Sequence, residues 1–145
     1  MNYSNYKKAL KVTVLPENRR VIASDVLLFN KCITPKMRKM VGYQNMQIIC
    51  QRMIKKGQLD FSLNIPFTAI AICSPEDEFD AEKGKVIALA RLNYMMAKKR
   101  KLIIEAFLYH YKNIVLLDKI SVFENILNKA WDNQTGCAEK LGRLI

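Results

Sequence analysis

The residues best suited to chemistry form an acidic segment near the middle of the chain. Residues 57–82 hold six carboxylates and no Lys or Arg, and Asp77, Asp80 and Glu82 stand close together within them. Carboxylate oxygens are the ligands that hard divalent cations prefer, so these three residues are candidate metal ligands. The segment lacks the glycine position and the ligand spacing of a calcium-binding loop. Because Asp80 followed by Glu82 also has the form of a helix N-terminal cap, the sequence favours capping over a metal site and predicts no cofactor.

The four cysteines and the single histidine offer a second chemistry. Cys73 and His110 have the types of a nucleophile and a base, but nothing in their spacing brings them together. No C-x-x-C pair occurs, which excludes zinc ribbons and thioredoxin-like sites. Cys32, Cys50 and Cys73 lie in hydrophobic runs, so we expect free, mostly buried thiols, and we expect His110 to pack at a helix end. The glycine motifs of phosphate-binding loops, dinucleotide folds and hydrolases are also absent, and the sequence therefore predicts no enzyme.

Basic side chains carry the strongest compositional signal. The 145 residues include 24 Lys plus Arg against 13 Asp plus Glu, a formal net charge of +11. Residues 1–56 have a net charge of +10 and residues 83–112 a net charge of +7, and the acidic residues 57–82 separate them. Clustered positive charge attracts polyanions; the alternative is a solvated surface that keeps a small protein soluble. We expect the phosphate contacts to come from ten side chains: Lys36, Arg38, Lys39, Arg52, Lys55, Lys56, Lys98, Lys99, Arg100 and Lys101.

Aromatic residues accompany some of these cations. Tyr3, Tyr6 and Tyr43 lie near basic residues and could stack on unpaired bases, with half-buried packing as the alternative. The basic run at residues 98–101 also matches a nuclear-import pattern.

These residues must be positioned by an α+β fold. Residues 6–15 and 20–29, joined by a turn at 16–18, predict a β-hairpin, with a helix over 20–29 as the alternative. Residues 59–65 and 67–73 alternate apolar and polar side chains on either side of Pro66, which predicts two short antiparallel strands.

Helix signals fill the rest of the chain. Thr34 before Pro35 predicts the start of a helix over residues 35–56, which Gly42 could interrupt. Asp80 opens a helical pattern over residues 81–112, and a last helix is expected from about Lys119 to Trp131, followed by a loop at 133–136.

The predicted architecture is a small antiparallel sheet from residues 6–29 and 59–73, packed against the helices at 35–56 and 81–112. Residues 1–112 would form the core domain, and residues 113–145 a helical extension of the same domain. The N-terminal sequence has no signal-peptide core, and no apolar run approaches ~18 residues. We therefore expect a cytoplasmic protein with no membrane partner.

Residues 67–92 resemble a segment of small accessory proteins from bacteriophages and prophages. In that segment a strand ends in Cys, an acidic turn with Asp-x-Phe-Asp and a Gly follow, and an Ala-rich helix begins. The matching positions here are Cys73, Asp77, Phe79, Asp80, Glu82, Gly84, Ala88 and Ala90. The resemblance implies a phage or prophage accessory role in a host cytoplasm. The same residues also have local structural roles, because Asp80 can cap the helix, Phe79 can pack on the sheet, and Gly84 permits close approach to a strand.

The leading hypothesis is a non-enzymatic protein that binds nucleic acid or a nucleoprotein through the ten cations. The runner-up is an inhibitor that binds a host protein, such as a bacterial defence complex. A third hypothesis is a metal-dependent enzyme that uses the acidic turn.

Overall fold

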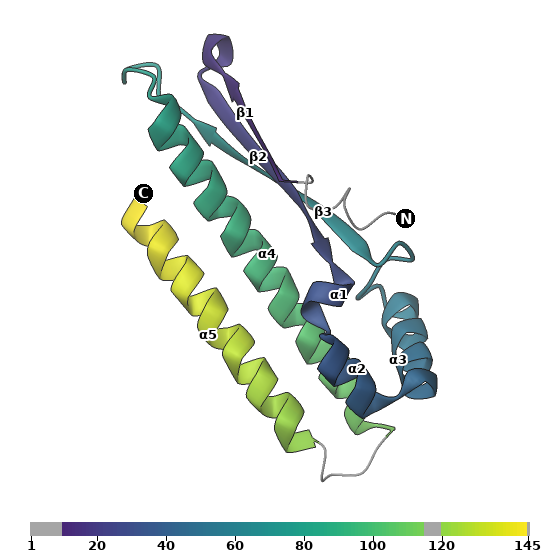
Figure 1. The fold of residues 1–145 in the computed structure, drawn as a ribbon. Coiled ribbons are helices and arrows are strands. Elements are labelled where there is room, and N and C mark those ends of the chain that lie inside the picture. Colours follow the sequence, from purple (N-terminus) through teal and green to yellow (C-terminus); the bar gives the residue numbers. More distant parts are fainter. Residues whose placement is uncertain (1–9, 115–119, 145) are drawn as a thin grey trace. The chain divides into compact units, whose positions relative to one another are not determined.

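A computed structural model describes residues 10–114 and 120–144, which form an α+β fold (Figure 1). The predicted fold class is confirmed. Residues 6–9 of the predicted first strand, together with Tyr3, Tyr6 and Lys119, lie outside the described residues. The elements in chain order are strand β1 (Lys11–Leu15), the short 3-10 helix η2 (Pro16–Asn18), strand β2 (Arg20–Leu28), helices α1 (Phe29–Cys32), α2 (Pro35–Val41) and α3 (Tyr43–Lys55), strand β3 (Asn64–Ile72), and helices α4 (Ala81–Lys112) and α5 (Ile120–Leu144). No helix of the described ranges is long and apolar enough to cross a membrane.

The three strands form one antiparallel sheet in the order β1-β2-β3 (Figure 1). β1 pairs with β2 from Lys11 opposite Ser24 to Leu15 opposite Arg20. On the other side of β2, the Cys73 N–H donates to the Arg19 carbonyl at 2.9 Å, and the Phe29 N–H donates to the Leu63 carbonyl at 3.0 Å. The predicted hairpin is therefore confirmed over its described part, and residues 20–28 form a strand rather than a helix.

Strand β3 differs from the prediction. The sequence predicted two strands separated by Pro66, but β3 is continuous from Asn64 to Ile72 and includes that proline. The hydrogen bonds of residues 63 and 73 show that odd-numbered backbone groups of this segment face β2. Pro66 is even-numbered and β3 is an edge strand, so its missing N–H removes no bond of the ladder.

The chain divides into two compact units. The described residues of unit 1 are 10–27, 66–96 and 135–144, and those of unit 2 are 28–65, 97–114 and 120–134. Helix α4 contributes its N-terminal half to unit 1 and its C-terminal half to unit 2. Helix α5 contributes its N-terminal part to unit 2 and its C-terminal part to unit 1.

The core of unit 1 forms where small residues let α4 lie close to the sheet. An added Cβ at Gly84 would lie 2.6 Å from Cγ2 of Val21, which confirms the predicted close approach to a strand. Asp80 Oδ1 accepts a hydrogen bond from the Lys83 N–H at 3.1 Å, so the predicted helix cap is also confirmed. Phe79 packs against this core, whose buried members are Val21, Ala23, Ala69, Ala71, Ala88 and Leu92.

The core of unit 2 is built mainly from helices. Thr34 Oγ1 caps α2 by accepting from the Met37 N–H at 3.3 Å, and Gly42, with a φ of 87°, separates α2 from α3. The ring of Phe123 on α5 stacks on that of Phe107 on α4, with 5.7 Å between the centroids. The large, fully buried side chains of this unit are Ile33, Met37, Ile49, Met53, Ile103, Phe107, Tyr111 and Phe123.

The C-terminal helix is longer than predicted. A helix ending near Trp131 and a loop at residues 133–136 were expected, but α5 runs without a break from Ile120 to Leu144. Each of Asn133, Thr135 and Gly136 lowers helix stability by at most about 1 kcal/mol, which neighbouring residues with higher helix propensity can offset. The prediction of a loop was wrong because it treated a weak local preference as a chain break.

Candidate nucleic-acid interface

The ten cations expected to contact phosphates all lie in unit 2. By sequence, residues 28–65 and 97–134 contain 14 Lys plus Arg against 5 Asp plus Glu, a net charge of +9. The remaining residues contain 10 Lys plus Arg against 8 Asp plus Glu, a net charge of +2. The cations of residues 36–56 and of residues 98–101, far apart in the sequence, thus belong to one compact unit, whereas most of the acidic segment between them belongs to the other.

Helices α2 and α3 carry exposed charges of one sign. Residues 26–59 contain no Asp or Glu, so no carboxylate from this stretch neutralises the cations on these helices. Arg38 is half-buried; its guanidinium donates to Asn30 Oδ1 and lies 5.8 Å from the centroid of the Phe29 ring. These contacts hold its charge in place at the helix surface. The exposed cations here are Lys36, Lys39, Arg52, Lys55 and Lys56.

The four consecutive cations of α4 do not share one environment. Lys98 is exposed and Lys99 is partly exposed. Arg100 lies against the buried thiol of Cys32; burial raises the pKa of that thiol to about 11, and the Arg100 charge and hydrogen bond oppose the rise. Successive residues of a helix point about 100° apart, so a run of four cannot all face solvent.

Lys101 departs furthest from the prediction. Its side chain is buried, with 9% of the residue exposed. Its Nζ lies 3.5 Å from Glu105 Oε1 and 3.4 Å from the centroid of the Trp131 ring. A cation held by a carboxylate and an aromatic face is not available to a phosphate, so the structure corrects the predicted role of Lys101. Arg100 is partly exposed, but its guanidinium interacts with Cys32, so we leave it out of the proposed interface.

Exposed aromatic side chains gather in the same unit as the positive charge. Among the described residues, four aromatic side chains are exposed, namely Tyr43, Phe61, Tyr109 and Trp131, and all four belong to unit 2. Lys101 covers the Trp131 ring, whereas Phe61 is 89% exposed and Tyr109 is 57% exposed. The sequence analysis considered Tyr43 but missed Phe61 and Tyr109. The sequence analysis placed Phe61 in a predicted strand at residues 59–65, but residues 59–63 are not in a strand, and Phe61 lies in a turn.

His110 lies at the end of α4, as predicted. It is buried, and its Nε2 shares a hydrogen bond of 2.9 Å with Gln58 Oε1. Burial lowers the pKa of His110 below its ordinary value, and the positive charges of Lys56 and Arg52 lower it further. The pKa of His110 therefore depends on the positive charges of Arg52 on α3 and of Lys56, the residue that follows α3.

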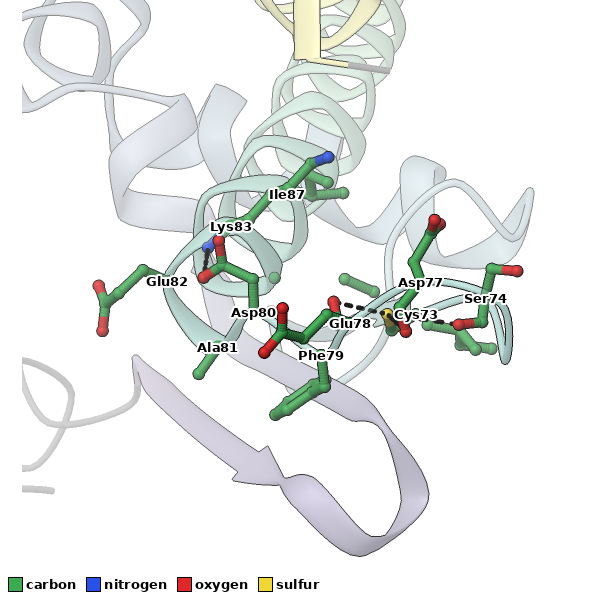
Figure 2. Close-up of a pocket in the computed structure, with 13 residues that line it drawn as sticks. Cys73, Ser74, Asp77, Glu78, Phe79, Asp80, Ala81, Glu82, Lys83 and Ile87 are labelled. Carbon is green, nitrogen blue, oxygen red and sulfur yellow. Dashed lines mark hydrogen bonds between the residues drawn. The ribbon is translucent and has the colours of Figure 1, made fainter.

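The acidic turn of unit 1 lines a cavity of about 770 Å³ (Figure 2). Figure 2 shows its carboxylates pointing in different directions rather than converging. Asp80 caps α4, and Glu82 forms an exposed ion pair of 3.0 Å with Lys85. Within residues 10–114 and 120–144, no three His, Cys, Asp or Glu side chains lie close enough together to hold a metal ion. Capping and ion pairing therefore account for Asp80 and Glu82, and nothing in the geometry gathers Asp77 with them as a third ligand.

Cys73 also has a structural environment in unit 1. Arg19 donates to the Cys73 sulfur at 3.4 Å and to the Ser74 carbonyl at 2.9 Å, and it also donates to the Asp77 carbonyl. These bonds tie the turn to the start of β2. The proposed base, His110, belongs to unit 2 and has its own partner there. None of the four cysteines forms a disulfide bond, but the expectation of mostly buried thiols was wrong: only Cys32 is buried, and Cys50, Cys73 and Cys137 are partly exposed.

Comparisons with known proteins assign no family: no family model, no curated protein and no solved structure matches this chain.

Proposed function

We propose that this chain binds nucleic acid through unit 2 and catalyses no reaction on it. The observation that carries the proposal is the net charge of +9 on unit 2, against +2 on the rest of the chain. Phosphate contacts require only cationic groups at the surface, and α2 and α3 present such groups with no carboxylate between residues 26 and 59.

Eight of the ten predicted cations remain in the proposed interface. Lys36, Lys39, Lys55 and Lys98 are exposed point charges that can follow a phosphate backbone. Arg38 offers a guanidinium whose position is fixed by Asn30 and Phe29. The other three are Arg52, Lys56 and Lys99.

The proposal extends to the setting in which the chain acts. The resemblance of residues 67–92 to phage and prophage proteins supports an accessory role in a host cytoplasm. The acidic turn in this segment caps α4 and is bound by Arg19, so it serves the fold of unit 1 in this proposal.

The salt dependence of binding tests the proposal. Each phosphate contact adds about −0.7 for single strands, or about −0.9 for duplex DNA, to the slope of log K against log salt. If all eight cations contact phosphates, the slope reaches about −6 to −7, and affinity for a labelled 20-mer falls by roughly 10³- to 10⁴-fold between 50 and 200 mM NaCl. A flat response, or no binding at 50 mM salt, contradicts the proposal. Co-purification with a host protein and no nucleic acid supports the inhibitor hypothesis instead.

A further inference from the structure

Phe61 is displayed to solvent at the tip of a tight turn. The Leu63 N–H donates to the Asp60 carbonyl at 3.1 Å, which closes the turn and places Phe61 at its second position. The ring is 89% exposed. Leaving a phenylalanine ring in water forgoes the free energy of burying it, so its presence at this position suits contact with a ligand.

Tyr109 has a second exposed ring, and a cation lies over it at a longer distance than Lys101 lies over Trp131. Lys56 Nζ is 5.9 Å from the centroid of the Tyr109 ring. Tyr109 also continues a face of α4 on which residues recur every three or four positions, so that Lys99, Leu102, Ala106 and Tyr109 point to the same side. A cavity of about 390 Å³ opens on this face, lined by Gln58, Lys99, Leu102, Glu105 and Ala106.

The combination of exposed rings and cations discriminates between forms of nucleic acid. Base faces are covered by stacking and pairing inside a duplex, whereas unpaired bases are free to stack on aromatic side chains. Stacked rings with cations along the backbone are the two components of single-strand binding sites. Among the described residues, the exposed aromatic side chains occur only in unit 2, where the positive charge also lies.

Resting on the proposed function, we infer that unit 2 binds single-stranded nucleic acid, with unpaired bases stacked on Phe61 and Tyr109. Lys56 then contacts the phosphate of the nucleotide whose base lies on Tyr109. DNA and RNA share the bases and phosphates that this arrangement recognises.

Alanine substitution of the two rings tests the inference. Binding is measured by fluorescence anisotropy with labelled oligo(dT) 20-mer, oligo(U) 20-mer and a 20-base-pair duplex. We expect Phe61→Ala and Tyr109→Ala each to weaken single-strand binding by roughly 5- to 100-fold, because one base loses its stacking partner. The salt slope should stay unchanged, since no charge is removed.

Three control variants separate stacking from other effects. Phe61→Tyr and Tyr109→Phe keep an aromatic face and should stay within about twofold of the wild type. Ile72→Ala removes a 63% exposed aliphatic side chain from unit 1 and should leave binding unchanged. Because Tyr109 lies edge-on to the buried His110 ring at 5.3 Å, its alanine variant is checked by thermal melting; if it unfolds, Phe61→Ala decides alone.

The possible outcomes distinguish this inference from the proposed function. Tight binding to oligo(dT) or oligo(U) that is weakened by the alanine variants, with weaker duplex binding, supports the inference, and the preferred oligomer identifies DNA or RNA. Wild-type affinity in both alanine variants, or duplex binding as tight as single-strand binding, overturns the stacking site but leaves the proposed function standing. No binding to any of the three probes at 50 mM salt overturns both.

Discussion

Gly84 and Gly136 both lie within helices, yet the structure predicts opposite effects for their replacement by alanine. Alanine in the interior of a helix is more stable than glycine by about 1 kcal/mol. A Cβ added at Gly136 of α5 meets no atom within 4 Å. Gly136→Ala should therefore stabilise the protein by about 0.5 to 1 kcal/mol.

Gly84 is the place where α4 lies closest to β2. A Cβ there would lie 2.6 Å from Cγ2 and 3.3 Å from Cβ of Val21, whereas carbon atoms pack best at about 3.5 to 4.0 Å. Val21 is fully buried and has a β-branched side chain with a restricted χ1, so it cannot turn away without strain. Overpacking of this kind costs about 1 to 3 kcal/mol, and after the gain in helix propensity Gly84→Ala should destabilise by up to about 2 kcal/mol.

Urea unfolding of four variants measures both effects. In the Val21→Ala background the clashing methyl group is gone, so Gly84→Ala should there become stabilising. The sign change appears as a non-additive double-mutant cycle, with a coupling of about 1 to 3 kcal/mol. If Gly84→Ala stabilises the otherwise wild-type protein as much as Gly136→Ala does, the close packing of α4 on β2 is refuted.

Two further residues give testable predictions. His110 is the single histidine, so its Hε1 resonance in an NMR titration reports its protonation directly. We expect its pKa to lie below 6.5 and to rise when single-stranded DNA neutralises the charges of Arg52 and Lys56. A pKa that DNA leaves unchanged would contradict the interface. Because the folded pKa of His110 lies below the unfolded value, its contribution to stability is present above about pH 6.5 and is lost as the pH falls toward the folded pKa, which thermal melts between pH 7 and 5 measure. Asp80→Ala should lower stability by about 0.5 to 2 kcal/mol through loss of the cap, and Mg²⁺ should change the melting temperature of neither protein. Stabilisation by Mg²⁺ that disappears in the variant would instead support a metal site at the acidic turn.

The predictable parts of the fold are those with local causes. The Thr34 cap, the Asp80 cap and the break at Gly42 each follow from a few neighbouring residues, and the structure confirms them. Pro66 could not be placed from the sequence, because its tolerance depends on β3 lying at a sheet edge and on which residues of β3 face β2. Both properties arise from pairing between distant segments.

In the candidate site, too, features with local causes could be predicted from the sequence, and features that depend on distant residues could not. The cations on α2 and α3 were predicted from composition, and the structure shows most of them exposed. The burial of Lys101 beneath Trp131 and the contact of Arg100 with Cys32 depend on residues distant in the sequence, which no local pattern reveals. The grouping of the cations of residues 36–56 and 98–101 in unit 2 likewise required the three-dimensional contacts.

The salt slope of two matched triple variants tests the central claim most directly. One variant replaces exposed lysines of unit 2, Lys36→Gln, Lys39→Gln and Lys55→Gln, and the other replaces exposed cations of unit 1, Lys11→Gln, Arg20→Gln and Lys83→Gln. Both lose three charges, so their net charges are equal. On oligo(dT), the unit 2 variant should reduce the magnitude of the slope by about 2, and the unit 1 variant should leave it at the wild-type value. Equal slopes for the two variants would contradict a nucleic-acid interface on unit 2.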